Sequence, residues 1–238
     1  MRIEQLHDAM RLALEKAGGK TPFAITGNRP TGRQADVIFR ADGVVAEVQL
    51  YQETQLGIEQ FMSVLYDTYN RWLFTYETPM VRGRGQIDTA NLPRESADQL
   101  MRILTRNMAP ALVTANKQIK QGKIDFGMRT ARGLLAYVMP LGVPIDPAIV
   151  LHGIARVFAS SPEDWDHIDH ILLATCRVDE IDTDHRPPYW SIITRDGEEP
   201  LPEAFEDRLK TAWFGILSTH FGKDIKYTEV EAFVGFGG

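Results

Sequence analysis

Hydrophobic residues at the start of the chain repeat with the period of a helix. Ile3, Leu6, Met10 and Leu14 share one helical face, and Gly18-Gly19 ends the pattern. The same period predicts further helices at 58–69, at 96–120 with Ser96 as its cap and a pause at Pro110, from Asp146-Pro147 onward, and at 203–221 before Gly222.

Other stretches have the apolar runs or the alternation typical of strands. Strands are expected at 22–26, 34–40, 44–51, 134–139, 171–177 and 190–194, with an edge strand within 227–238 and a loop at 80–93. The order of elements predicts an α/β fold with a mixed central sheet flanked by helices on both faces. The strands at 134–139 and 171–177 should be parallel neighbours with a right-handed crossover. We expect one domain over 1–238, with a core in 1–140 and additional strand–helix elements in 141–238.

The hairpin at 34–51 contains the candidate chemistry. Asp42-Gly43 predicts a two-residue turn, which sets Ile38 opposite Glu47. Alternation along the strands then gathers Asp36, Glu47 and Gln49 on one face and apolar side chains on the other. The two carboxylates become diagonal neighbours about 7–8 Å apart at Cα, close enough to share a hard cation. The alternative is an amphipathic hairpin whose polar face meets water, with an Arg40–Glu47 salt bridge that contributes little.

The run Gln34-Ala35-Asp36-Val37-Ile38-Phe39, followed by Ala46-Glu47-Val48-Gln49, resembles the PD-(D/E)xK phosphodiesterase superfamily. The resemblance implies a restriction-endonuclease-like fold and a Mg²⁺ or Mn²⁺ cofactor. It makes Asp36 the first acid and Glu47 the second, and puts Gln49 in the lysine position. Ala35 stands where proline is common. A glutamine amide offers hydrogen bonds but no positive charge, and it occurs in both active and silent members.

The resemblance also implies contributions from neighbouring elements. A helix before the hairpin often supplies another acid, for which Glu4 is the best candidate and Asp8 lies on the same helix. Gln60 suits a glutamine found early in the following helix and is expected, like Lys117 and Lys120, to contact nucleic acid. The segment from Ala115 to Lys120 and the strand at 134–138 look like a pattern of uncharacterised nuclease-like members.

Charge is distributed unevenly along the chain. The net charge of −6 does not by itself indicate nucleic-acid binding. The stretch 101–133 is nevertheless basic, whereas 163–199 is acidic. Each run has a simple interpretation as a solvated face. The functional interpretation is a basic surface for a polyanion, with Lys117 and Lys120 as contacts.

Other features have weaker interpretations. The segment 164–170 has the composition of a zinc site, but a capped turn before a strand explains it as well. Cys176 lies in an apolar run and is expected to be a buried small hydrophobe. The sequence has no signal-peptide layout and no apolar run long enough for a membrane span, so we expect a cytoplasmic protein with no membrane partner.

The sequence therefore predicts a Mg²⁺-dependent nuclease acting on DNA or RNA, in which Asp36 and Glu47 hold metal and Gln49 orients water. One alternative is a catalytically inactive nuclease-like module that binds nucleic acid or a protein partner. Another is an interaction protein without metal, and a homodimer is left open.

Overall fold

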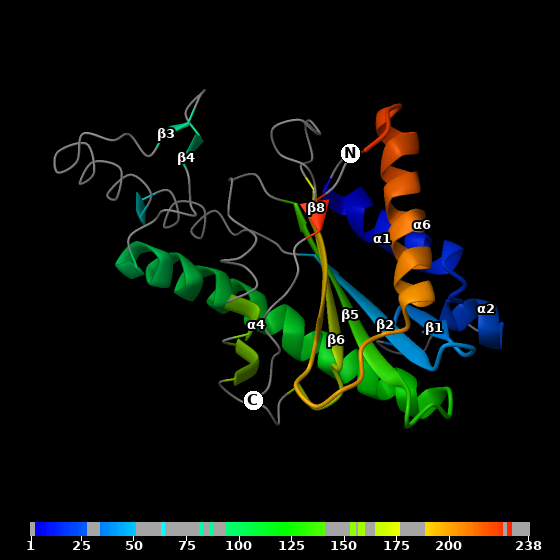
Figure 1. The fold of residues 1–238 in the computed structure, drawn as a ribbon. Helices are drawn as coiled ribbons and strands as arrows, with labels where there is room; N and C mark the ends of the chain where they lie inside the picture. Colours follow the sequence, from blue (N-terminus) through cyan, green and yellow to red (C-terminus); the bar gives the residue numbers. More distant parts are fainter. Residues whose placement is uncertain are drawn as a thin grey trace.

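The structure is a computed structural model in which 3–27, 34–50, 63–64, 81–82, 86–87, 94–140, 153–155, 157–159, 165–176, 189–225 and 228–229 are described. Its helices are α1 (Ile3–Lys16), α2 (Pro22–Thr26), α4 (Arg94–Asp125) and α6 (Glu203–Phe221) (Figure 1). Its strands are β1 (Val37–Phe39), β2 (Val44–Leu50), β3 (Val81–Arg82), β4 (Gln86–Ile87), β5 (Arg132–Pro140), β6 (His170–Cys176), β7 (Tyr189–Thr194) and β8 (Thr228–Glu229). Within these ranges no helix is long and apolar enough to cross a membrane.

Six strands form one mixed sheet in the order β1-β2-β5-β6-β7-β8. β1 is antiparallel to β2, whereas β2, β5 and β6 are mutually parallel. β7 then runs antiparallel to β6, and the short β8 pairs with β7 in parallel at the far edge. The predicted parallel pairing of the strands at 134–139 and 171–177 is confirmed, and so is the mixed α/β class. The expected loop at 80–93 is wrong in one respect, because β3 and β4 pair there as a small antiparallel ribbon.

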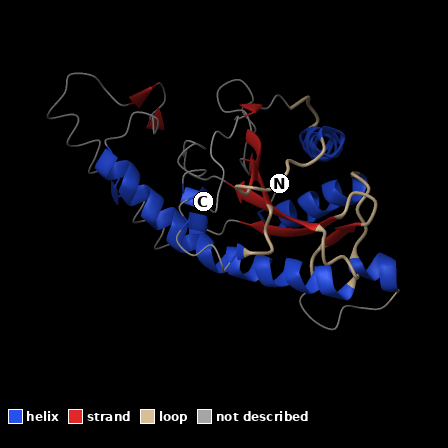
Figure 2. Ribbon diagram, turned by 60° about the horizontal axis from the view of Figure 1, so that its bottom comes forward, coloured by secondary structure: helices blue, strands red, loops and turns tan. Residues whose placement is uncertain are grey.

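Helices cover both faces of this sheet (Figure 2). On one face, α1 and α6 pack against each other and against side chains such as Phe39, Val48 and Ala136. On the other face, α4 packs against Val45, Leu135 and others. Because both faces are covered, β2 and β5 are buried along most of their length, as parallel strands usually are.

The expected strand at 22–26 is instead the short helix α2. Thr21 caps it, because its hydroxyl oxygen accepts a hydrogen bond from the Ala24 amide at 3.3 Å. Pro22 occupies the first turn, where its missing N–H does no harm, and Gly27 ends the helix at a φ of 69°. Capping residues thus decide the structure of a segment whose apolar content also suits a strand.

The β1–β2 hairpin has a different register from the predicted one. Val44 pairs with Phe39 rather than with Ala41, so four residues, 40–43, connect the strands. The connection is held from outside the hairpin: the Arg208 guanidinium donates to the Asp42 carboxylate at 2.7 Å, and the Gly43 carbonyl accepts from the Arg132 amide at 2.8 Å. A shift of two residues leaves every side chain on its predicted face, because the side-chain period of a strand is two.

The helix at 96–120 extends beyond both predicted limits. α4 runs without interruption from Arg94 to Asp125, so Ser96 lies inside it and Pro110 does not interrupt it. The other terminal predictions are confirmed, since α1 ends before Gly18-Gly19 and α6 ends at Gly222. Most of the helix predicted at 58–69, and the start of the one predicted at Asp146-Pro147, lie outside the described residues.

Candidate functional site

Asp36 and Glu47 face each other at the open end of the β1–β2 hairpin. Continuing the register by one residue beyond Val37 and Ala46 sets the two acids directly opposite, not diagonal as predicted. The Asp36 amide donates to the Glu47 carboxyl group at 3.2 Å. In turn the Val48 amide donates to Oδ2 of Asp36 at 3.0 Å. The two acids are therefore held by each other's strand, which fixes their separation.

Glu47 is almost completely enclosed, with only 2 % of its surface exposed. Burial is the largest influence on its side chain and, with the charge of Asp36, raises the pKa of Glu47 to about 9; hydrogen bonds from Gln49 and from the Asp36 backbone oppose the rise. Glu47 thus requires a proton or a cation at neutral pH. A hairpin whose polar face simply meets water is excluded at this position.

Gln49 lies beside Glu47 on the face of the sheet covered by α4. Its side-chain amide donates to Oε1 of Glu47 at 2.8 Å and approaches the Gln118 side chain of α4 at 3.5 Å. Gln118 in turn reaches the Gln34 carbonyl at 3.5 Å. Gln49 therefore lies beside Glu47, and Gln118 is a neighbour that sequence reasoning did not identify.

His7 is the other residue that the sequence analysis missed. It comes from α1, which packs on the opposite face from α4, and its Nε2 lies 3.5 Å from Oδ2 of Asp36. The hydrogen bond with Asp36 is the main cause that raises the pKa of His7, against the lowering effect of burial. One signal was present in the sequence: His7 follows Glu4 by three residues and so shares its helical face.

The remaining predicted site residues are not recorded in contact with the pair. Asp8 is exposed and lies near Arg11 instead. The side chain of Glu4 and the whole of Gln60 lie outside the described residues. Lys117 and Lys120 are exposed on α4. Burial is the main cause that lowers the pKa of His167, and the nearby charge of Lys120 is a smaller contribution in the same direction.

The residues of this site fit a hard divalent cation in their chemistry. Both acids offer carboxylate oxygens, and within the described part of the chain Oδ1 of Asp36 has no recorded hydrogen bond. A cation at this point would also offset the burial and the charge of Asp36, which together raise the pKa of Glu47. Among the described residues there is no group of three or more histidine, cysteine or acidic side chains arranged to hold a metal. Any ion here would therefore retain several water ligands, as Mg²⁺ commonly does.

Comparisons with protein-family models, with curated proteins and with solved structures found no match to this chain. The site must therefore be interpreted from its own geometry.

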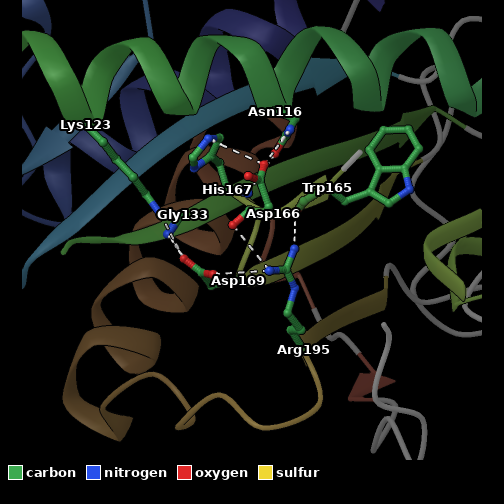
Figure 3. A network of polar contacts seen from close by, with 8 residues as sticks. All are labelled: Asn116, Lys123, Gly133, Trp165, Asp166, His167, Asp169 and Arg195. Carbon is green, nitrogen blue, oxygen red and sulfur yellow. Dashed lines mark hydrogen bonds and ion pairs between the residues drawn. The ribbon is translucent and has the colours of Figure 1, made fainter. Parts of the chain in front are cut away.

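A second polar cluster occupies the segment proposed as a zinc site (Figure 3). His167 lies in the turn before β6, with its backbone amide bonded to Asn116 at 3.0 Å and its ring 3.4 Å from the Asp166 carboxylate. His170 is buried within β6, and its ring pairs with Thr194 at 3.2 Å. The two rings have separate partners, which supports the capped turn rather than zinc.

Asp169 is the centre of this cluster. Its carboxylate accepts from Lys123 of α4 at 3.0 Å and from the Gly133 amide of β5 at 2.7 Å. Arg195 lies 3.9 Å from the same carboxylate and donates to the backbone oxygens of Trp165 and Asp166 (Figure 3). One buried carboxylate thus links α4, β5 and the residue after β7. Its charge is balanced by two cations, so this network is structural and differs from the Asp36–Glu47 pair, where His7 is the basic neighbour among the described residues.

Proposed function

We propose that this protein is a metal-dependent phosphodiesterase of the PD-(D/E)xK type, with a restriction-endonuclease-like fold and nucleic acid as its substrate. Asp36 and Glu47 would hold Mg²⁺ or Mn²⁺, and Gln49 would orient the attacking water. A bound divalent ion of this kind polarises a phosphoryl oxygen and makes a bound water more acidic. The chain's own contribution is to hold the two acids at a fixed separation and to keep Glu47 away from bulk solvent.

One observation carries the proposal: the buried carboxyl group of Glu47 lies against a second carboxylate, and among the described residues the basic side chain beside this pair is His7, which lies against Asp36 and not against Glu47. Enclosing two acids together is unfavourable unless a proton or a cation separates them. By contrast, the Asp169 carboxylate has Lys123 and Arg195 as neighbours.

A second candidate function is a nuclease-like module that binds nucleic acid or protein without cutting. The observation in its favour is the hydrogen bond from Gln49 to Glu47, which occupies the amide at 2.8 Å and supplies no positive charge to a developing phosphorane. In this reading Gln49 and a proton stabilise Glu47 permanently.

Calorimetric titration of Mg²⁺ and Mn²⁺ into the wild type, Asp36→Ala and Asp8→Ala tests the metal site. Asp8 is a matched control because it is an exposed acid on α1 beside the site. We expect the wild type and Asp8→Ala to bind metal alike, and Asp36→Ala to lose binding. Indistinguishable titrations of the wild type and Asp36→Ala would contradict the metal site.

A cleavage assay then separates the two candidates. Plasmid DNA, single-stranded DNA, branched DNA and RNA are each incubated with protein and Mn²⁺, with Asp36→Ala as the inactive control. Cleavage by the wild type alone supports the nuclease. Metal binding without cleavage of any of these substrates supports the inactive module.

A further inference from the structure

The exposed side of α4 carries a row of positive charge. Arg102, Arg106, Lys117 and Lys120 are all exposed in the structure. Because an α-helix turns about 100° and rises about 1.5 Å per residue, the four positions fall within an arc of about 60° and span about 27 Å. The row lies on the side of the helix that faces away from the sheet.

The part of α4 that carries this row has no acidic residue of its own. Between Asp98 and Asp125 the helix has five cations and no aspartate or glutamate, in a chain whose net charge is −6. The fifth cation, Lys123, is buried and paired with Asp169, so it does not belong to the row. Like charges at the spacing of Arg102 and Arg106 weaken a helix by a few tenths of a kcal/mol. The helix therefore carries these like charges although a mixture of positive and negative side chains would make it more stable.

A recess at one end of the row has the chemistry of a phosphate site. Its volume is about 410 Å³, and its described lining is Ser63, Val64, Gln99, Arg102, Ile103 and Arg106. The polar members are two guanidinium groups, an amide and a hydroxyl group, with no carboxylate among them. Arginine binds phosphate oxygens through paired N–H donors, which makes such a lining suitable for a phosphate group.

The length of the row favours a polymer over a small phosphate compound. Lys117 lies about 17 Å beyond Arg106 along the helix, farther than one small ligand would reach. A nucleic-acid strand offers a phosphate about every 3.4 Å, so it can contact both ends of the row. The exposed apolar residues described on the same side, Val113 and Ile124, are also about 17 Å apart and form no continuous patch for a protein partner.

We propose that the exposed face of α4 from Arg102 to Lys120 binds the phosphate backbone of a nucleic acid, independently of any metal at the Asp36–Glu47 pair. The identification of the polyanion as nucleic acid rests partly on the proposed function. Binding by this face needs neither Asp36 nor a divalent ion.

The test measures binding of the full chain to a fluorescein-labelled DNA duplex, in EDTA and over a series of salt concentrations. The variants are the doubles Arg102→Ala/Arg106→Ala and Lys117→Ala/Lys120→Ala. The matched control, Lys16→Ala/Lys20→Ala, removes the same two charges from exposed positions at the end of α1 and just after it. Each face variant should reduce the slope of log K against log salt by about 1.8 and weaken binding by on the order of 50-fold at about 0.1 M salt. The control should retain the wild-type slope.

Three results would overturn the inference. The first is the absence of duplex binding by the wild type even at low salt, and the second is an equal loss in the control. The third is a loss confined to Arg102→Ala/Arg106→Ala, which would leave only the recess as a binding site. Asp36→Ala separates this inference from the proposed function. If this variant binds the duplex normally and loses the metal binding seen in the wild type, both are supported. If the wild type binds the duplex but does not respond to metal, this inference alone is supported.

Discussion

The amide of Asp36 donates to the carboxyl group of Glu47 at 3.2 Å, and the carboxylate of Asp36 accepts from the amide that follows Glu47 at 3.0 Å. Each acid is thus held by the strand of the other. The pair cannot separate to relieve its repulsion without loss of the hairpin's hydrogen bonds. His7 lies 3.5 Å from Asp36, but in the described residues it does not contact Glu47, so a proton or a cation must stabilise the Glu47 carboxyl group.

Glu47→Gln tests this requirement. At pH 8 in EDTA the variant should be at least as stable as the wild type, because a carboxamide needs neither a proton nor a cation in a buried position. Asp36 and Gln49 donate to different oxygens of Glu47, so the single oxygen of the carboxamide keeps one of these hydrogen bonds, and Gln49 can turn its own oxygen towards the new NH2 group. Mn²⁺ at about 100 times its Kd should stabilise the wild type by about 2.7 kcal/mol and leave the variant unchanged. Thermal melting with and without Mn²⁺ measures both effects, with Asp8→Asn as the control that should respond like the wild type.

Gly133→Ala should destabilise the protein by about 3 kcal/mol. An added Cβ would overlap the backbone oxygen of His167 and lie 2.8 Å from a methyl group of Ile119, so the turn before β6 must move away from β5. Chemical denaturation measures the change in the free energy of unfolding. Gly215→Ala in α6 is the matched control, since its Cβ meets nothing within 4 Å. That substitution should raise stability by about 0.5–1 kcal/mol, and destabilisation by both would contradict the packing argument.

Asp169→Ala should cost about 3–5 kcal/mol of stability, because it leaves Lys123 buried without its partner and removes the acceptor of the Gly133 amide. Lys123→Met should cost less, since Asp169 keeps Gly133 and Arg195 as partners. Urea unfolding of both variants gives the order of the two losses. An equal or larger loss in Lys123→Met would show that Asp169 is not the centre of the network.

His170 predicts a loss of stability in mild acid. Burial is the main cause that lowers the pKa of His170 to about 4, below its ordinary value of 6.5. Between these values the unfolded chain binds a proton that the folded chain does not, so the contribution is present above pH 6.5 and falls as the pH drops towards 4. The slope approaches about 1.4 kcal/mol per pH unit.

Unfolding of His170→Gln over the same range measures this contribution. The variant should lose that part of the pH dependence, whereas His220→Gln, at an exposed position of α6, should retain it. A wild-type slope that persists in His170→Gln would assign the acid sensitivity to other groups.

The spacing of apolar residues correctly predicted the helices and strands that have an apolar face of their own. The helices α1 and α6 and the strands β5, β6 and β7 lie close to their expected positions, because each has a continuous or regularly spaced apolar surface. The segment 22–26 was wrongly predicted because its apolar residues suit a strand, while its caps favour a helix. Helix capping depends on a few local hydrogen bonds, which the spacing of apolar residues does not reveal.

The sequence by itself determined that Asp36, Glu47 and Gln49 share one face of a hairpin, since side-chain alternation survives a shift of two residues. The tertiary structure decided the register, because Arg208 and Arg132 hold the connection at 40–43 open from outside the hairpin. It also decided that Glu47 is buried and that His7 and Gln118 approach the pair from opposite faces of the sheet. Those relationships depend on how helices far apart in the chain pack on the sheet, which local pattern does not specify.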